Sequence, residues 1–308
     1  MSSQHNQRVL VTGGSGLLGR TLIKELIANG YEVLGLAFSR VSNGLIKCDL
    51  NDGSAVEQVF DKFKPALVVH AAAQRAPDQF DSDRDASFKL NVDASRSLAE
   101  QCTSRSIDLI HISTDYVFDG KSPPYSENDL VSPVNAYGLS KADAEAAVAK
   151  ASNGNAVILR VPVMYGDETK LGESAVSALM ATLLDKSGQQ RKVSSYELRR
   201  PSSTEDISCI ITQLVSKKLA SPGDIRGVYQ WSGKEELTKY DMVKIMAEVF
   251  NLPMDHIVED ATEGSGPVAR PRDVTMSTTR LEQLGISRHT PFADSVRRLF
   301  SKFVNQQV

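Results

Sequence analysis

A tyrosine and a lysine with the spacing of a helical pair, Tyr137 and Lys141, are the residues of this chain best suited to proton transfer. Side chains four residues apart lie on one face of a helix. An ammonium group beside a phenol stabilises the phenolate, which lowers the pKa of the tyrosine and makes it a proton donor at neutral pH. Ser113 and Thr114 end the strand expected before this helix, and the Thr114 hydroxyl would orient a carbonyl for hydride attack. We therefore predict Thr114, Tyr137 and Lys141 as the catalytic residues of a carbonyl reduction.

The same spacing recurs at Tyr240 and Lys244, which provides an internal control. That pair follows no strand ending in serine or threonine and lies far from the glycine-rich turn near the N-terminus. We interpret it as part of a helix surface. The prediction for Tyr137 and Lys141 therefore depends on their order in the chain, after a glycine-rich turn and a Ser/Thr strand end, and not on spacing alone.

The glycine-rich turn contains Gly13, Gly16 and Gly19, between an apolar β-branched run over residues 8–12 and a helical pattern over residues 17–27. Strand, glycine turn and helix in this order place a helix N-terminus against a pyrophosphate. Gly13 allows the sharp turn, Gly16 lets the backbone approach the phosphates, and Gly19 lets the helix pack on the strand. An ordinary glycine turn is the alternative, since the spacing is weak evidence without its strand and helix.

The second strand, expected over residues 31–37, indicates which dinucleotide would bind. A site selective for NAD usually has an acidic residue near the end of that strand, where it binds the ribose 2′-hydroxyl. This chain has Phe38, Ser39 and Arg40 there. A hydroxyl and a guanidinium suit a 2′-phosphate, so we expect NADP (NADPH) rather than NAD; the alternative is a solvated loop arginine. Asp49, after a short third strand, would accept a hydrogen bond from the adenine amino group or cap the next helix.

Further cofactor contacts follow from the same layout. Small residues after the fourth strand would let a cofactor lie close to the backbone, in the crevice where such sheets bind ligands. Lys141 would also hold the nicotinamide ribose, and the cofactor would supply the hydride. The predicted cofactor-binding residues are Thr12, Gly13, Gly16, Leu17, Leu18, Gly19, Ser39, Arg40, Asp49, Leu50, Ala71, Ala72, Ala73, Asn91, Tyr137, Lys141 and Val163.

Buried apolar runs alternate with helical patterns over the first half of the chain, which predicts an α/β fold with a Rossmann-type doubly wound parallel sheet. We expect strands over residues 8–12, 31–37, 45–50, 66–70, 107–114, 156–160 and 227–231. We expect helices over residues 17–27, 55–63, 84–105, 134–150, 171–184, 204–217, 239–250 and 292–303. Residues 188–201 are predicted to be polar and irregular.

The regular alternation stops after Tyr165, which predicts a second, smaller unit. We assign residues 1–165 and about 203–232 to the NADP-binding domain. Residues from about 166 to 202 and from 233 to 308 are assigned to a discontinuous C-terminal lobe that serves a substrate or a partner. Residues 1–7 are expected to be a frayed tail.

Composition excludes several classes of protein. The 308 residues are 41% hydrophobic and 24% charged with a net charge of −3, which is typical of a soluble globular protein and favours neither nucleic acid nor an anionic membrane as a partner. The polar N-terminus lacks the apolar segment of a signal peptide, and no apolar run approaches the length of a membrane span. The three cysteines and five histidines are scattered without metal-ligand spacing. We therefore expect a reduced, cytoplasmic or nuclear protein without a structural metal.

Several segments carry a resemblance to known families. The segments 12–19 (TGGSGLLG) and 137–141 (YGLSK) resemble the extended short-chain dehydrogenase/reductase superfamily. The segments 113–120 (STDYVFDG), 123–125 (PPY) and 135–138 (NAYG) are similar to its dTDP-4-dehydrorhamnose reductase (RmlD-like) group. Within that group the chain most resembles the regulatory β subunits of methionine adenosyltransferase, in segments 91–95, 173–176, 231–233, 238–240, 250–253 and 290–292.

This resemblance implies an NADP-binding regulatory subunit that forms a hetero-oligomer with the methionine adenosyltransferase catalytic subunit and modulates S-adenosylmethionine synthesis. Residues 74–78 look like the β-subunit version of that segment and not the reductase version, which disfavours rhamnose synthesis. The chain ends at Val308, whereas the family's β subunits carry a longer C-terminal tail that reaches the catalytic partner.

Three interpretations of function stay open. The first is a regulatory subunit whose surface, and not its tyrosine, does the work. The second is an enzyme that reduces a 4-keto nucleotide sugar with NADPH, motivated by the intact catalytic residues. The third is an NADP-sensing scaffold for another partner. Four arginines would either hold a nucleotide-sugar diphosphate or face solvent or a partner, namely Arg199, Arg200, Arg270 and Arg272.

Overall fold

The computed structural model describes residues 7–41, 44–75, 83–264 and 268–305. Parts of three predictions from the sequence therefore lie outside the described residues: the frayed tail up to residue 6, residues 76–78 of the segment compared with the β subunits, and the last residues, 306–308. Among the described residues, no helix combines the length and the apolar character needed to pass through a membrane.

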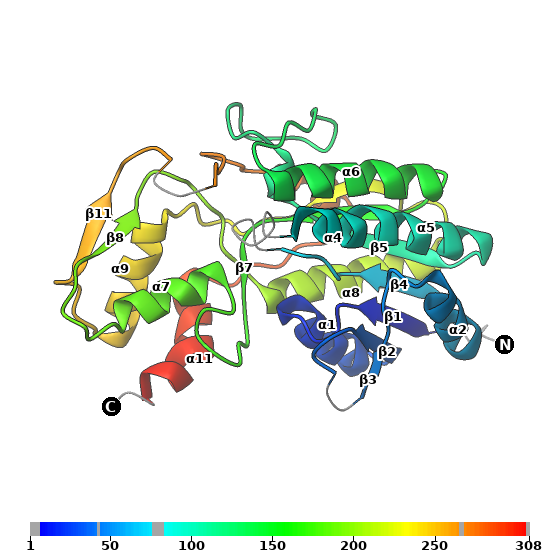
Figure 1. Ribbon diagram of the computed structural model, residues 1–308, viewed down its shortest axis with the longest axis horizontal. Helices are drawn as coiled ribbons and strands as arrows, with labels where there is room; N and C mark the ends of the chain where they lie inside the picture. Colours follow the sequence, from blue (N-terminus) through cyan, green and yellow to red (C-terminus); the bar gives the residue numbers. More distant parts are fainter. Residues whose placement is uncertain (1–6, 42–43, 76–82, 265–267, 306–308) are drawn as a thin grey trace.

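A parallel sheet of seven strands lies at the centre of the described part of the chain (Figure 1). Its strands are β1 (Arg8–Thr12), β2 (Glu32–Ala37), β3 (Leu45–Lys47), β4 (Leu67–His70), β5 (Asp108–Thr114), β6 (Val157–Val161) and β10 (Gly227–Gln230). They lie in the order β10-β6-β5-β4-β1-β2-β3. The direction of winding reverses between β1 and β4, and such a reversal opens the crevice where doubly wound sheets bind ligands. The predicted fold class is confirmed.

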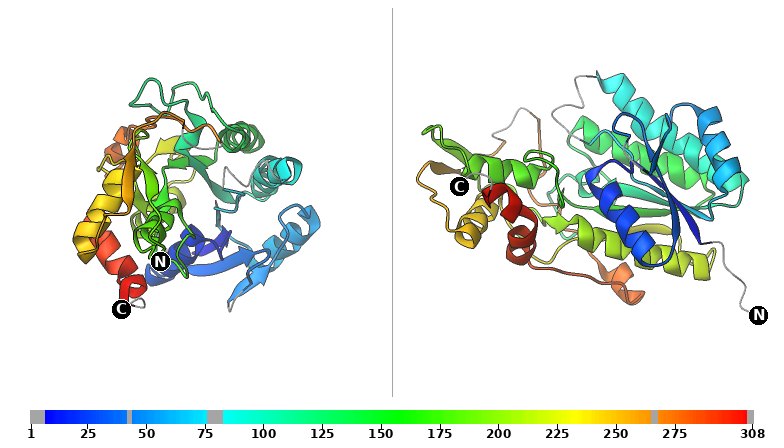
Figure 2. Two further views of the ribbon diagram at one scale, coloured as in Figure 1. Left: turned by 60° about the vertical axis from the view of Figure 1, so that its left-hand side comes forward. Right: turned by 90° about the horizontal axis from the view of Figure 1, so that it is seen from below.

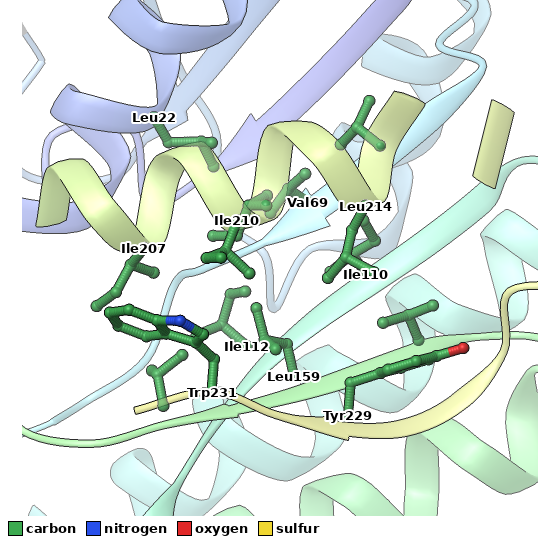
Figure 3. Packing of buried hydrophobic residues seen from close by; sticks show 14 of the residues in the cluster. Leu22, Val69, Ile110, Ile112, Leu159, Ile207, Ile210, Leu214, Tyr229 and Trp231 are labelled. Atoms are coloured by element: carbon green, nitrogen blue, oxygen red, sulfur yellow. The ribbon is translucent and has the colours of Figure 1, made fainter. Parts of the chain in front are cut away.

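Helices cover both faces of the sheet (Figure 2). One face carries α1 (Leu17–Ala28) and α8 (Thr204–Ala220), and the other carries α2 (Gly53–Phe63), α5 (Ala94–Ser104) and α6 (Ala136–Ala151). In α1, α2 and α5 the buried apolar residues recur every three or four positions, which gives each helix one buried side. The buried side of α6 also contains Ser140, Lys141 and Glu145. Figure 3 shows the result for α8, whose Ile207, Ile210 and Leu214 pack against side chains of the central strands.

The segment predicted as one helix over residues 84–105 changes its winding in the middle. Here α4 (Arg84–Phe88) continues into a π-helical turn, η2 (Lys89–Asp93), and then into α5. Such turns are rare and occur often at functional sites. Asn91 lies in this turn and is 1% exposed, which places its amide against the carboxyl end of the sheet. The sequence pattern missed the turn because one wider turn shifts the apolar period only locally.

A second lobe lies beside the sheet (Figure 1, left). It contains α7 (Ala175–Leu183), β8 (Arg191–Ser194), α9 (Lys239–Phe250), β11 (Ile257–Asp260) and α11 (Phe292–Asn305). Its core is separate from that of the sheet and includes Tyr165, Met180, Val243, Phe292 and Phe300. Two short parallel strands, β7 (Met164–Tyr165) and β9 (Ser202–Ser203), run where the chain passes between the lobes.

Two predicted elements of this lobe were wrong in part. Residues 188–201 are not wholly irregular, because β8 pairs in parallel with β11. The four residues of β8 are too few for a periodic signal, and the partner strand lies far along the chain. The helix predicted from residue 171 begins only at Ala175, because the Ser174 hydroxyl accepts a hydrogen bond from the Ser177 amide at 3.0 Å and thereby caps it.

The range 233–308 does not stay in the second lobe. Within it, α10 (Thr279–Gln283) lies against β10, and Leu281 and Ile286 belong to the core of the sheet. The chain therefore returns to the first lobe before α11 ends it in the second. Arg280 holds α10 against β10, because its guanidinium donates to the carbonyl oxygens of Val228 at 2.5 Å and Arg226 at 2.7 Å.

A buried ion pair joins α6 to the sheet. The Arg160 guanidinium, on β6, donates to the Glu145 carboxylate, with Nη2 2.7 Å from Oε2 and Nε 3.0 Å from Oε1. Arg160 also donates to Gln230 Oε1 at 3.1 Å, and the Ser113 hydroxyl donates to Glu145 at 2.5 Å. Because α6 carries Tyr137 and Lys141, this network fixes the helix that bears the predicted catalytic pair.

Replacing Glu145 with alanine should lower the free energy of unfolding by about 3–5 kcal/mol, because Arg160 would stay buried without its counter-charge. Urea unfolding followed by circular dichroism measures the loss. Glu57→Ala is the matched control, since the Glu57 side chain is 57% exposed and its pair with Arg105 is of a kind worth about 0–1 kcal/mol. Equal losses in the two variants would contradict the role given to the buried pair.

Candidate functional site

The glycine-rich turn brings three backbone segments into direct contact. Gly13 has a φ of +70°, and a Cβ there would lie 2.8 Å from the Ala72 backbone nitrogen. A Cβ on Gly19 would overlap the Gly13 carbonyl oxygen. The Gly14 amide donates to the Leu36 carbonyl at 2.8 Å, which ties the turn to β2. The turn thus meets β2, the loop after β4 and the first turn of α1 with no side chain between them.

A cavity of about 420 Å³ opens beside this turn and extends to Tyr137 and Lys141 on α6. Most of the predicted cofactor-binding residues line it: Gly13, Gly16, Leu17, Leu18, Gly19, Ser39, Arg40, Asp49, Leu50, Ala71, Ala72, Ala73, Tyr137 and Lys141. The structure therefore brings together the two ends of the predicted site, which are far apart in the sequence.

The residues at the glycine end of the cavity fit a dinucleotide. Gly16 is the N-cap of α1, and a Cβ placed on it meets only the Gly13 carbonyl oxygen, at 3.1 Å. Leu17 and Leu18 line the cavity at the start of the helix, where backbone N–H groups have no partner within the helix. Such a helix start is suited to a pyrophosphate.

Two predicted residues lie behind the cavity and not on its wall. Thr12 is fully buried; its hydroxyl lies 2.7 Å from His70 Nδ1 and accepts from the Ala72 amide at 3.2 Å. Asn91 accepts from the Gln74 amide at 2.8 Å, and donates to the Gln74 carbonyl and to the Ser140 hydroxyl, both at 3.0 Å. Both side chains hold the loop after β4 in place, so the structure gives them positioning contacts.

Val163 and Thr114 are also absent from the cavity lining. Val163 packs against the core of the second lobe, and its neighbour Met164 lines the cavity instead. The Thr114 hydroxyl donates to Asp115 at 3.0 Å and is hydrogen-bonded to the Tyr137 side chain. Thr114 therefore lies behind Tyr137, which lines the cavity.

Asp49 lines the cavity, and the alternative that it caps the next helix was wrong. Its carboxylate accepts from the Asn51 backbone amide at 2.9 Å and from the Asn51 side chain at 3.0 Å. The N-cap of α2 is Asp52, which accepts from the Ser54 and Ala55 amides at 3.0 and 3.2 Å. Two acidic residues three positions apart made this assignment ambiguous in the sequence.

The cavity has further lining residues outside the predicted set: Ser15, Leu36, Ala37, Phe38, Cys48, Asn51, Arg75, Ala86, Leu90, Ile112, Ser113 and Met164. Phe38 carried a local signal in the sequence, because it is an aromatic residue that directly precedes Ser39. In the structure its side chain is 60% exposed. Arg75 and Met164 carried no such signal. They reach the cavity only because the loop after β4 and the crossing to the second lobe meet there.

The expectation that Lys141 lowers the pKa of Tyr137 was wrong for this geometry. The Lys141 ammonium donates to the Ile112 carbonyl at 2.8 Å and lies 3.1 Å from His111 Nε2, so it is directed toward β5. Burial lowers the pKa of Lys141 to about 8. Burial raises the pKa of Tyr137 to about 12, against the opposing effect of its hydrogen bond with Thr114. In this arrangement Tyr137 is a neutral hydrogen-bond donor and a weak acid.

Two histidines form the polar layer behind Lys141. The rings of His70 and His111 are 5.2 Å apart, and both are buried. Burial, reinforced by the positive charge of Lys141, lowers the pKa of His70 to about 3 and that of His111 well below its ordinary value. Both rings are therefore neutral at physiological pH, which permits a charged lysine beside them.

The four arginines singled out in the sequence do not line this cavity. Arg199 is 4% exposed and donates to the carbonyls of Leu198 at 2.6 Å and Arg272 at 3.1 Å. Its guanidinium lies 5.6 Å from the Tyr116 ring centre, close to Asp115. Arg200 donates to the Lys234 carbonyl, Arg270 to the Val268 carbonyl, and Arg272 stacks on Tyr196. Arg199 is therefore not a surface arginine, and a role for these arginines in holding a nucleotide-sugar diphosphate stays a prediction.

The chain is similar to known proteins over almost its whole length. The family model described as the RmlD substrate binding domain matches residues 7–305. The chain is 38% identical to methionine adenosyltransferase 2 subunit beta of Pongo abelii, over 97% of this chain and 89% of the relative. The protein of the same name from Xenopus tropicalis is 39% identical, over 97% and 88%. A dTDP-4-dehydrorhamnose reductase of Aggregatibacter actinomycetemcomitans is 30% identical, over 90% of this chain and 92% of the relative.

Solved structures of the same kind superimpose on it. The dTDP-4-dehydrorhamnose reductase of Clostridium acetobutylicum gives a TM-score of 0.82 at 25% identity, covering 96% of this chain and 99% of the other. The corresponding enzyme of Bacillus anthracis, solved in complex with NADP, gives a TM-score of 0.81 at 26% identity with the same coverage.

Gly16→Val should abolish dinucleotide binding while the protein stays folded. The new side chain would occupy the place of the phosphates, and the loss of two or more charge-assisted hydrogen bonds weakens binding by about 100-fold or more. Titration of NADPH fluorescence measures the dissociation constant. Gly53→Ala, at the start of α2, is the control, since its Cβ would only make ordinary contacts with Gln101 and Ser97. Wild-type affinity in Gly16→Val would contradict the placement of the phosphates.

Lys141 should make stability depend on pH in a defined window. Its pKa is about 8 in the folded protein and near the ordinary 10.5 in the unfolded chain, so the unfolded chain binds more protons between those values. The stability of the wild type relative to Lys141→Met should therefore rise from pH 8 to pH 10.5. Thermal unfolding midpoints of both proteins measure this difference. A pH-independent difference would show that Lys141 is not desolvated.

Proposed function

Since this chain belongs to the RmlD substrate binding domain family and, within it, to the methionine adenosyltransferase subunit beta group, we propose that it is the NADP-binding regulatory subunit of a methionine adenosyltransferase. In this role it associates with the catalytic subunit and modulates S-adenosylmethionine synthesis. One observation carries the proposal: the similarity extends over 97% of the chain and therefore includes the second lobe as well as the nucleotide-binding sheet.

NADP is the cofactor of this proposal. The cavity beside the glycine-rich turn offers a helix start to the pyrophosphate, and Ser39 and Arg40 lie at its adenosine end. Arg40 suits a 2′-phosphate, and the end of β2 has no acidic residue that would bind a ribose hydroxyl. When bound, NADPH would supply a hydride, and Tyr137 and Lys141 would lie beside its nicotinamide end.

The state of the predicted catalytic group favours a binding role. Lys141 is directed toward Ile112 and His111, and the pKa of Tyr137 is raised to about 12. A general acid works best when its pKa is near the working pH. In this geometry the tyrosine holds a position beside the cofactor and transfers a proton poorly.

The free thiols described for Cys48, Cys102 and Cys209 suit a reducing compartment, which the cytosol and the nucleus both provide.

A reductase is the second candidate, because a specific observation favours it. Thr114, Tyr137 and Lys141 are all present: Tyr137 and Lys141 line one end of the cavity, and Thr114 is hydrogen-bonded to Tyr137. A relative 30% identical to this chain is described as a dTDP-4-dehydrorhamnose reductase. On this alternative, NADPH reduces the 4-keto group of a nucleotide sugar. An NADP-sensing scaffold for another partner is the remaining outcome of the tests below.

The chain should co-purify with the methionine adenosyltransferase catalytic subunit from the same source. Isothermal titration should give a dissociation constant at or below the micromolar range, and the KM or the rate of S-adenosylmethionine synthesis should change in the complex. Tyr137→Phe is the matched control and should bind the catalytic subunit and modulate it like the wild type, because proton transfer by the phenol has no role in this function. No binding at micromolar concentrations of both proteins would remove the proposal.

The reductase alternative has its own test. On the regulatory proposal, NADPH oxidation in the presence of dTDP-4-dehydro-6-deoxy-L-mannose should stay at the background rate. A rate above background that Tyr137→Phe lowers by about 100-fold or more would establish the reductase instead, since a positioned general acid contributes about that much. A rate that the substitution leaves unchanged would come from a contaminant.

A further inference from the structure

Three arginines meet one buried glutamate at the mouth of the cavity. Glu173 lies just before α7, in the second lobe, and its side chain is 3% exposed. Arg20, on α1, binds both of its oxygens, with Nη1 2.8 Å from Oε1 and Nη2 3.0 Å from Oε2. The Thr169 amide also donates to Oε2, at 3.1 Å. This glutamate is therefore held firmly where the two lobes touch.

Arg40 and Arg75 complete the group. Arg40 Nη1 lies 3.7 Å from Glu173 Oε1, which is an ion-pair distance and too long for a hydrogen bond. The Arg75 guanidinium donates to the backbone carbonyl of Glu173. Arg40 and Arg75 both line the cavity. They come from the loops after β2 and β4, so three segments of the first lobe present positive charge to Glu173: Arg20 and Arg40 to its carboxylate, and Arg75 to its backbone carbonyl.

The charges of this group do not cancel. The group contains three guanidinium groups and one carboxylate, an excess of positive charge that Arg40 and Arg75 bring to the wall of the cavity. Burial alone would favour protonation of Glu173, but its hydrogen bonds with Arg20 and Thr169 outweigh burial and lower its pKa, so it stays ionised. The excess attracts anions, and the phosphate oxygens of a nucleotide are anions that arginine binds well.

Arg40 is the arginine that can change partner. Its side chain is 61% exposed and reaches Glu173 only at the longer distance, whereas the Arg20 side chain is 26% exposed and fully engaged. A 2′-phosphate at the adenosine end would offer Arg40 a closer and more highly charged partner than Glu173. A 2′-hydroxyl would offer no charge, and the pair between Arg40 and Glu173 would persist.

We propose that Glu173 is a specificity-determining residue for the cofactor: an internal anion that competes with the 2′-phosphate of NADP for Arg40 and does not compete with the 2′-hydroxyl of NAD. The second lobe thereby takes part in distinguishing the two nucleotides at a site otherwise built by the first lobe. This inference rests on the proposed NADP-binding function.

The test compares affinities for NADP and NAD by isothermal titration at one salt concentration, in the full-length protein. Glu173→Gln keeps a hydrogen-bonding side chain and removes the charge. It should tighten NADP binding by about three- to fivefold, the size of one partly exposed ion pair, and leave NAD within about twofold of the wild type. Glu57→Gln, which removes an exposed carboxylate paired with Arg105, should change neither affinity.

A double-mutant cycle tests whether Glu173 affects NADP binding through Arg40. Arg40→Met should remove most of the preference for NADP. In that background Glu173→Gln should no longer change the ratio of the NADP and NAD affinities, because the arginine for which Glu173 and the 2′-phosphate compete is absent. Glu173→Asp, which keeps the charge and shortens its reach toward Arg40, should raise the ratio in the same direction by a smaller amount. It serves as the second variant if Glu173→Gln fails to fold.

The outcomes that overturn the inference are separate from those that overturn the proposed function. A wild type that binds NADP, with Glu173→Gln changing both affinities equally, would show that Glu173 only holds the lobes together. An unchanged effect of Glu173→Gln in the Arg40→Met background would also overturn the inference. A wild type that binds neither nucleotide would remove the proposed function, and this inference with it.

Discussion

Direct contact between backbones determines the cofactor side of this structure. A Cβ on Gly19 would overlap the Gly13 carbonyl, and one on Gly13 would lie 2.8 Å from the Ala72 nitrogen. These approaches bring the start of α1, the end of β2 and the loop after β4 to one point. The cavity lies where these segments meet, and the helix start is presented to it without side chains between. The proposed binding of the nucleotide depends on this close contact between backbone segments.

A polar layer beneath the cavity supports the backbone contacts. Thr12 bonds to His70, which lies 2.8 Å from the Ser95 hydroxyl, and Lys141 lies against His111. The low pKa values of His70 and His111 keep both rings neutral. This neutrality allows Lys141 to be charged, because a protonated His111 ring 3.1 Å away would repel the ammonium group. The spacing of the tyrosine and the lysine and their order in the chain predicted both residues, but the direction of the lysine depends on these neighbours.

The sequence predicted those features that depend on short segments. Strand and helix patterns gave the fold class, and the glycine-rich turn together with the expected strand ends gave the predicted part of the cavity wall, because neighbours in the chain decide both. Residues that reach the cavity through tertiary contact left no such signal. Met164 and Arg75 are examples, and so is the pairing of Glu173 with Arg20, whose partners are 153 positions apart. The direction of Lys141 was missed for the same reason, since its hydrogen-bond partners, His111 and Ile112, come from β5.

The return of the chain to the first lobe at α10 has a mechanical consequence. The chain passes between the lobes around β7, before β9, after β10 and on both sides of α10. Several of these connections lie side by side, because β7 pairs with β9, Leu198 with Asp273 and Arg199 with Leu237. In a hinge movement a few residues absorb the rotation, and here such residues would be needed in every connection at once. Rotation of the lobes is therefore restricted to an axis that passes near all of the connections. Neither lobe is one continuous length of chain, so removing either at a single cut would leave apolar core surface exposed on the other.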